Sequence, residues 1–176
     1  MSKVKFLKED KKAKSKSFFF TKESKTFDGN YIKFLENFFN KEKKDIRICL
    51  HPSQKSNHHD MVILQQKNNF YTPHKHLRKG ETYHIIKGSM VCILFDEKGK
   101  IKNICRLKKN NIFRTPLNTY HTMSPISKYV IYHESKTGPF LKKGDSIFPN
   151  WAKGQKKKEI YIEKIKNIVK SLKNHG

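Results

Sequence analysis

Apolar and polar residues alternate along much of the middle of the chain, with the period of two that is typical of β-strands. Glycine, proline and asparagine separate these short stretches, as they do at turns. The expected strands are residues 46–51, 61–64, 70–76, 81–86, 90–95, 101–107, 121–123 and 129–134. Many short, evenly spaced strands predict a mainly β fold, a jelly roll or a related closed barrel.

Two other segments repeat their apolar residues at the helical period of 3.6. The first runs roughly to Lys43 from a cap at Asp28 or Asn30, and the second spans residues 159–172. Each combines an apolar face with lysine-rich surroundings, which predicts N- and C-terminal helices that flank the β domain. For the first helix, a location on a membrane surface is the alternative.

These patterns divide the chain into four parts. Residues 1–16 form a basic tail that we expect to be disordered, because it is rich in lysine and poor in apolar residues. Residues 17–45 supply a short apolar strand and the first helix, which pack on a barrel formed by residues 46–136. Residues 137–176 leave the barrel and end in the second helix. The apolar strand fits an edge of the barrel, and a strand that joins two copies in a homodimer is the alternative.

The net charge points to weak rather than specific contacts with nucleic acids. The 176 residues include 39 basic and 15 acidic ones, a formal net charge of +24, yet only four of the basic residues are arginine. Proteins that read nucleic acids rely on arginine for bidentate contacts with bases and phosphates. We therefore expect non-specific attraction to polyanions and no specific nucleic-acid partner.

The cysteines and the N-terminus bear on the cellular compartment. Cys49, Cys92 and Cys105 show no metal-binding or redox spacing, and a sparse, odd set is typical of a reducing compartment. The N-terminus lacks the apolar core of a secretion signal, and no apolar run has the length of a membrane span. These features predict a cytoplasmic protein.

Candidate chemistry is concentrated in one stretch, which holds His74, His76 and Glu81. On a strand the two histidines point to the same face, and a turn ending at Gly80 returns the chain so that Glu81 meets them across a hairpin. A later turn delivers His121 onto another strand. Three imidazoles and one carboxylate suit one divalent transition metal, and iron, manganese, nickel, zinc and cobalt are all compatible with this set.

The spacing of these residues resembles the two motifs of the cupin superfamily, H-x-H-x4-E-x6-G and P-x-G-x2-H. The residues that fit are His74, His76, Glu81 and Gly88 in the first motif, and Pro116, Asn118 and His121 in the second. The resemblance implies a small β-barrel in which the three histidines and the glutamate hold one metal.

Asparagine stands where three glycines of these motifs are expected, at Asn68, Asn110 and Asn118. A left-handed backbone is costly for most residues, but asparagine adopts it more readily than other non-glycine residues. We therefore expect these positions to take a left-handed conformation without loss of the turns.

A longer series of sequence segments, which occur in a fixed order along the chain, points to one family within this superfamily. Its segments are residues 47–51, 73–76, 91–96 with Gly99, 120–122, Glu134 with 138–140, and 151–152. This series resembles the WbuC family of cupin-fold metalloproteins over most of the chain. The resemblance implies one bound metal and a setting among genes for lipopolysaccharide O-antigen and other surface polysaccharides. It implies no particular reaction.

Four further residues are candidates for contact with a substrate. Arg47 and His51 lie on one predicted strand, and an arginine near a metal can bind a carboxylate or a phosphate of a sugar nucleotide; a structural salt bridge is the alternative for Arg47. Glu134 is a candidate catalytic base if it faces inward, and Tyr83 a candidate donor of a proton or hydrogen bond. A pair between Glu134 and Lys136, and a place for Tyr83 in the cavity wall, are the alternatives.

Other histidines carry no such expectation. His58 and His59 fall in a predicted polar loop, residues 52–59, where we expect them to be solvated. His84 is an odd number of positions from Glu81, so on a strand it faces away from the metal.

Three functions follow from these features. The first is a metal-dependent enzyme for a sugar or sugar nucleotide, acting as an isomerase, epimerase, lyase or oxygenase in surface-polysaccharide synthesis. The second is a cupin that binds a metal and a small molecule without turnover. The third, a nucleic-acid binder driven by charge, requires a continuous basic face, whereas the lysines are spread over the tail, helices and turns.

Overall fold

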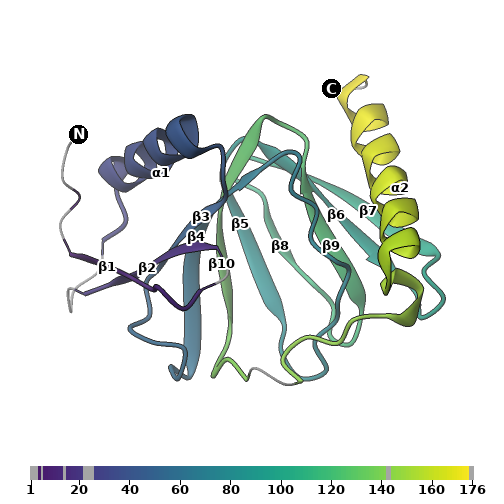
Figure 1. Ribbon diagram of the computed structural model, residues 1–176, viewed down its shortest axis with the longest axis horizontal. Helices are drawn as coiled ribbons and strands as arrows, with labels where there is room; N and C mark the ends of the chain where they lie inside the picture. Colours follow the sequence, from purple (N-terminus) through teal and green to yellow (C-terminus); the bar gives the residue numbers. More distant parts are fainter. Residues whose placement is uncertain (1–3, 5, 14, 22–25, 142–143, 175–176) are drawn as a thin grey trace.

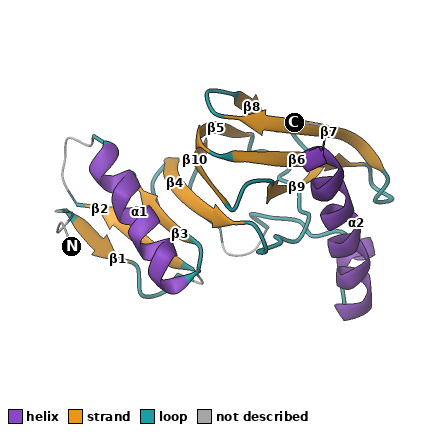
Figure 2. Ribbon diagram, turned by 90° about the horizontal axis from the view of Figure 1, so that it is seen from above, coloured by secondary structure: helices purple, strands orange, loops and turns teal. Residues whose placement is uncertain are grey.

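The chain forms two β-sheets that pack against each other, with one long helix on the outer side of each (Figures 1 and 2). The computed structural model describes residues 4, 6–13, 15–21, 26–141 and 144–174. Strands dominate this part of the chain, so the predicted mainly β class is confirmed.

The larger sheet has seven strands in the order β1-β2-β3-β4-β10-β5-β8. Their bounds are Leu7–Glu9 for β1, Lys16–Phe20 for β2, Ile46–Cys49 for β3, His58–Gln66 for β4, Glu81–Lys87 for β5, Ile112–Arg114 for β8 and Tyr129–Thr137 for β10. The neighbours β2 and β3 run parallel, and the other neighbouring pairs are antiparallel.

The smaller sheet has three antiparallel strands in the order β7-β6-β9. They span Ile101–Lys108 in β7, Ser89–Phe95 in β6 and Tyr120–Pro125 in β9. The central strand β6 is apolar on both faces, because Met90, Cys92 and Leu94 face the larger sheet while Val91 and Ile93 face outward under a helix.

Three apolar clusters hold the layers together. The central cluster lies between the sheets and combines residues such as Met61 and Tyr132 of the larger sheet with Cys92 and Met123 of the smaller one. Helix α1 (Gly29–Glu42) covers the outer face of the larger sheet, and helix α2 (Gln155–Asn174) covers that of the smaller sheet. The prediction that both helices flank the β domain is confirmed.

Helix α1 begins where the sequence predicts. The Asp28 carboxylate accepts a hydrogen bond of 2.8 Å from the Asn30 backbone N–H, which satisfies one of the free donors at the helix start. Tyr31, Leu35 and Phe39 form its buried face. This face packs on β3 and β4, as predicted for a helix that flanks the β domain.

The predicted closed barrel is not found. The described strands form two separate sheets, which meet through the side chains of the central cluster and not through a continuous hydrogen-bonded ladder. The sequence predicts a jelly roll or a related closed barrel, and two packed sheets are compatible with the jelly roll.

Residues 70–76 do not form the predicted regular strand. His74 and Lys75 make only single bridges, to His121 and Ile147. Pro73 has no backbone N–H to donate, so a continuous ladder cannot run through this segment. Isolated β-bridges, and not a continuous ladder, therefore fix the position of this segment.

An additional strand and several strand boundaries also differ from the prediction; for example, β3 ends at Cys49, before His51. A short strand, β1, lies within the tail for which composition predicts disorder; it pairs with β2, and Leu7 packs against the cluster beneath α1. The strand β4 begins at His58, inside the predicted polar loop, because its first residues pair with the end of β10.

The C-terminal segment returns to the sheets through Trp151, in the short 3-10 helix η1 (Asn150–Ala152). Its ring lies 5.2 Å from that of Phe95 and 5.9 Å from that of Tyr120, measured between centroids. Gly99 has a φ of +83°, and a Cβ there would lie 2.7 Å from the Trp151 ring, so this turn requires glycine. None of the described helices combines the length and apolar character that a membrane span needs.

Candidate metal centre

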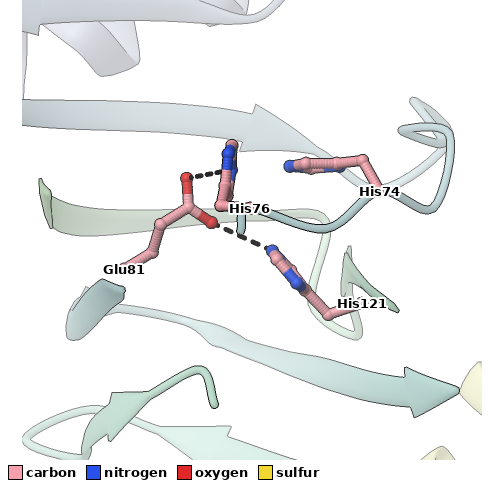
Figure 3. A group of neighbouring side chains, drawn as sticks. All are labelled: His74, His76, Glu81 and His121. Carbon is pink, nitrogen blue, oxygen red and sulfur yellow. Dashed lines mark hydrogen bonds and ion pairs between the residues drawn. The ribbon is translucent and has the colours of Figure 1, made fainter. Parts of the chain in front are cut away.

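His74, His76, Glu81 and His121 converge between the two sheets (Figure 3). One potential ligand atom from each lies within 4.8 Å of the others. Glu81 is the first residue of β5, His121 the second of β9, and the other two histidines lie in the segment between β4 and β5. The sequence-based prediction that these four side chains meet is confirmed.

Backbone hydrogen bonds hold the contributing segments together. His74 and His121 exchange two of them, of 3.1 and 2.9 Å, and the Asn118 N–H donates to the His76 carbonyl at 2.9 Å. The predicted hairpin between the histidine segment and Glu81 is not formed; β5 pairs with β10 and β8 instead. Convergence arises from the bridge to β9, which joins residues far apart in the sequence.

Each histidine uses one ring nitrogen to fix its orientation. Nδ1 of His74 donates to the Thr72 carbonyl at 3.1 Å, and Nδ1 of His121 donates to the Thr119 carbonyl at 3.0 Å. Nδ1 of His76 contacts the Asp145 carbonyl in the same way. Because the proton is on Nδ1, the Nε2 lone pair of each ring is free for a metal, an arrangement common among metal-binding histidines.

Glu81 presents its carboxylate to two of these rings. Oε2 lies 2.9 Å from Nε2 of His121, and Oε1 lies 3.0 Å from Nε2 of His76. The second contact lacks good hydrogen-bond geometry, so Nε2 of His76 is a buried polar atom without a hydrogen-bond partner. A cation shared by the two imidazole nitrogens and the carboxylate would satisfy the buried Nε2 of His76, so a metal fits the residues present.

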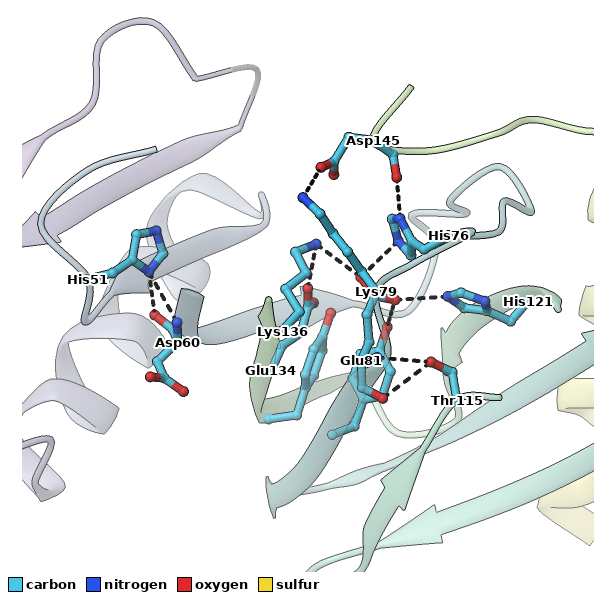
Figure 4. A network of polar contacts seen from close by, with 12 residues as sticks. His51, Asp60, His76, Lys79, Glu81, Thr115, His121, Glu134, Lys136 and Asp145 are labelled. Atoms are coloured by element: carbon cyan, nitrogen blue, oxygen red, sulfur yellow. Dashed lines mark hydrogen bonds and ion pairs between the residues drawn. The ribbon is translucent and has the colours of Figure 1, made fainter. Parts of the chain in front are cut away.

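The carboxylate of Glu81 is held in turn by Tyr83 and Lys136. The Tyr83 hydroxyl donates to Oε2 at 2.8 Å, and Nζ of Lys136 lies 2.9 Å from Oε1. Lys136 also contacts Glu134 at 3.0 Å (Figure 4). These contacts orient the carboxylate and leave it little freedom to turn away.

The pKa shifts of His74 and Glu81 favour the protonation states of metal ligands. Burial, assisted by the neighbouring His121, lowers the pKa of His74 to about 4, so this ring is neutral at neutral pH. Burial alone would raise the pKa of Glu81, but Lys136 and the histidines outweigh it and hold the pKa well below its usual value. Burial, together with the charge of Glu81, raises the pKa of Tyr83 well above its usual range, so its hydroxyl stays a donor.

Two of the three asparagines have the predicted backbone. Asn118 has a φ of 52° and Asn110 a φ of 70°, both in the left-handed region. Asn68 is not among the described residues with positive φ, so that part of the prediction is wrong. The turn at residues 67–69 closes without a left-handed residue at this position.

A cavity of about 400 Å³ is lined by two of the four ligand candidates, His74 and Glu81. It is lined by all four predicted substrate and catalytic residues, which are Arg47, His51, Tyr83 and Glu134. The condition set for Glu134, that it face inward, is met. A larger hollow of about 810 Å³ beside β1 and α1 contains none of these residues and none of the ligand candidates.

Sequence reasoning missed several residues of the site. His59 was expected to be solvated, but it is only 4% exposed and lines the cavity. Its partner across the sheet is Lys136, which shares the inward face of β10 with Glu134. The sequence indicated Lys136 only as a partner of Glu134, a pair that the structure contains, and the structure adds its contact with Glu81. Asp145 lies in an irregular segment whose sequence has no pattern that indicates a role in the site.

Comparison with known proteins gives limited matches. A family model described as a domain of unknown function (DUF6016) matches residues 37–107. No curated protein matches the chain. The predicted membership of the WbuC family stays a prediction.

The chain is also similar to parts of solved structures. One is an oxalate decarboxylase, OxdC, of Bacillus subtilis, with 15% identity, a TM-score of 0.44, and 52% of this chain and 24% of that chain covered. CapF with an inhibitor has 14% identity, a TM-score of 0.48, and coverages of 54% and 29%. The Cnp3 cupin domain of Schizosaccharomyces pombe has 14% identity, a TM-score of 0.43, and coverages of 51% and 61%. The match thus spans about a quarter of the oxalate decarboxylase and less than two thirds of the other two.

Proposed function

We propose that the protein binds one divalent transition metal through His74, His76, Glu81 and His121, and that it acts on a small polar ligand in the adjoining cavity. The resemblance of the sequence to the WbuC family favours a sugar or sugar nucleotide of surface-polysaccharide synthesis as that ligand. A homodimer remains a further prediction. Iron, manganese, nickel, zinc and cobalt all suit the ligand set.

The observation that carries the proposal is the orientation of the three imidazoles. All three Nδ1 atoms face backbone carbonyl oxygens, and the Nε2 atoms point toward one carboxylate. Histidines that serve only to fill a core have no reason to share this orientation. A metal ion satisfies the carboxylate and the buried Nε2 of His76 at once.

The charge of the cavity supports the same proposal. Its lining includes four carboxylates, on Asp10, Asp45, Glu81 and Glu134, against the two cations Arg47 and Lys136. With neutral histidines the lining carries a formal charge of −2, although the whole chain carries +24. A divalent metal would neutralise this local excess.

The residues around the site suggest how a ligand would be handled. A bound metal would polarise a carbonyl or lower the pKa of a bound water. Glu134 lines the cavity, lies 3.0 Å from Nζ of Lys136, and can accept a proton from a ligand hydroxyl. Tyr83 donates to Glu81, so its first role in this proposal is to position that ligand.

The test is elemental analysis of purified protein, beside the variants His76→Ala and His121→Ala. We expect one equivalent of metal in the unmodified protein and almost none in either variant. His84→Ala is the matched control, because His84 is exposed on β5 and faces away from the cluster. Equal metal content in all four proteins would remove the basis of the proposal.

A binding protein without turnover is the second candidate. The observation in its favour is that the acid and base candidates already have partners, Glu134 with Lys136 and Tyr83 with Glu81. Incubation of the metal-loaded protein with sugar nucleotides separates the two candidates. Turnover that is lost in Glu134→Gln, with metal content unchanged, supports the enzyme; ligand binding without any product supports the binding protein.

A further inference from the structure

A polar row crosses the inward face of the larger sheet. In the register of the strands, Lys136 of β10 lies opposite Glu81 of β5 on one side and opposite His59 of β4 on the other. His51, just after β3, stacks its ring on that of His59, with 4.1 Å between centroids and 3° between planes. The row therefore leads from Glu81 through Lys136 and His59 to His51, at the far end of the cavity. Figure 4 shows Glu81, Lys136 and His51 of this row.

Two cavity-lining residues outside the metal cluster, His59 and Arg47, have unused hydrogen-bonding capacity. Nε2 of His59 is buried and has no hydrogen-bond partner, although the residue lines the cavity. Arg47 donates from Nε to the Ser17 hydroxyl at 3.0 Å, but it forms no ion pair with any carboxylate of the described residues. A half-buried arginine without a carboxylate partner is free to bind one from a ligand.

The other charged residues of the cavity lining are already engaged. Asp45 accepts hydrogen bonds from the Gln66 N–H, the Asn69 amide and the Tyr71 hydroxyl, at 2.9, 2.6 and 2.6 Å. Glu134 and Lys136 pair with each other. Of the two cations in the lining, Lys136 forms ion pairs with carboxylates, and Arg47 forms none with the described residues.

The stacked histidines add neutral donors to this cation. Burial, with a smaller contribution from His59, lowers the pKa of His51 to about 4, and burial likewise lowers the pKa of His59. Nδ1 of His51 lies 3.0 Å from the Asp60 carbonyl oxygen and 3.1 Å from the Asp60 amide nitrogen. The pair can therefore form hydrogen bonds with a ligand without adding two further buried charges.

We infer that the far end of the cavity binds an anionic group, a carboxylate or a phosphate, of a ligand whose opposite end faces the metal cluster. This inference rests on the proposed function and narrows its substrate class to anionic sugars such as sugar phosphates or uronic acids. Arg47 supplies the bidentate cation, and His59 and His51 supply hydrogen bonds. Two strand spacings separate Glu81 from His59, roughly 10 Å, so a ligand that reaches both ends is larger than a lone anion.

The test uses inorganic phosphate and acetate as probes of the two anion types. Each is titrated into the metal-loaded, full-length protein at physiological ionic strength, which screens the surface lysines. Binding is followed by calorimetry and by the ring ¹⁵N shifts of His51 and His59. The variant is Arg47→Gln, and the control is Arg106→Gln, which removes the same charge from β7, outside the cavity.

We expect saturable binding of at least one probe, a shift of the His59 ring, and affinity weakened about ten-fold or more in Arg47→Gln but not in Arg106→Gln. The probe that binds more tightly identifies phosphate or carboxylate as the recognised group. Equal affinities in the unmodified protein and Arg47→Gln, or no saturable shift of His59, would overturn the inference.

A second pair of variants covers a failure of Arg47→Gln to fold. His59→Gln should weaken anion binding, whereas His84→Gln, on the exposed face, should not. Metal content is measured on the same samples, so the two proposals fail separately. If the unmodified protein holds metal but its anion binding is absent or does not depend on Arg47, only the anion site is rejected. Absence of metal in the unmodified protein rejects the proposed function.

Discussion

At the scale of single residues, hydrogen bonds and ion pairs outside the ligand set orient the side chains of the candidate metal centre. Tyr83 and Lys136 hold the two oxygens of Glu81, and backbone carbonyls hold Nδ1 of each histidine. In metal sites such supporting contacts are nearly as important for affinity as the ligands themselves. Two predictions belong to this scale.

The first concerns the hydroxyl of Tyr83. Tyr83→Phe removes a hydrogen bond of 2.8 Å to Glu81 while the ring still fills the core. We expect metal affinity to fall roughly ten-fold, measured by competition with a metal-binding dye. Tyr132→Phe is the control, because Tyr132 is equally buried but its hydroxyl contacts Gln65 at 3.4 Å. The same loss in both variants would argue against a specific role for Tyr83.

The second concerns the left-handed backbone of Asn118, whose φ is 52°. Asn118→Ala should lower the free energy of unfolding by about 1 kcal/mol, because alanine is strained in this region. Asn118→Gly should be neutral or slightly stabilising, since glycine adopts positive φ without strain. Denaturant unfolding of both variants checks this. A more stable alanine variant than glycine variant would contradict the backbone assignment.

At the scale of elements, irregular segments complete what the strands begin. The strands β5 and β9 carry Glu81 and His121, but His76 is fixed by the carbonyl of Asp145, in the segment between β10 and η1. The Asp145 carboxylate anchors that segment through Lys79, at 2.5 Å, and through the N–H of Leu141. The C-terminal excursion therefore supports the candidate metal centre.

This arrangement predicts an effect of Asp145 on metal binding although it is not a ligand. Asp145→Ala should lower metal affinity by about ten-fold, because the carbonyl that orients His76 loses its anchor. Glu97→Ala is the control. It breaks the ion pair between Lys75 and Glu97; Lys75 precedes His76 in the chain, and Glu97 is largely exposed. Titration calorimetry compares the two, and an equal effect would show that nearby charge matters rather than the anchor.

At the scale of the whole molecule, a strongly basic surface surrounds a cavity whose lining is acidic. The chain carries a formal charge of +24, while the cavity lining carries −2. The surface charge attracts polyanions in general. It is separate from the cavity, where Arg47 is the one cation of the lining without an acidic contact in the described part of the chain.

We accordingly predict weak, sequence-independent binding to DNA. Affinity for unrelated duplexes should be similar and should fall steeply as salt is raised, because such binding depends on released counterions. Fluorescence anisotropy at two salt concentrations measures this. A duplex that stays bound at high salt in preference to others would instead favour the nucleic-acid function that composition argues against.

The sequence alone determined much of this protein. The period of two predicted most strands, the period of 3.6 predicted both helices, and the spacing of His74, His76, Glu81 and His121 predicted that they meet. These features are local or carried by a motif, so each can be read from neighbouring residues. Only the tertiary structure decided that the sheets stay separate, that Asp145 supports His76, and that His59 is buried beside His51. Those outcomes depend on contacts between segments far apart in the chain, whose pairing no local pattern encodes.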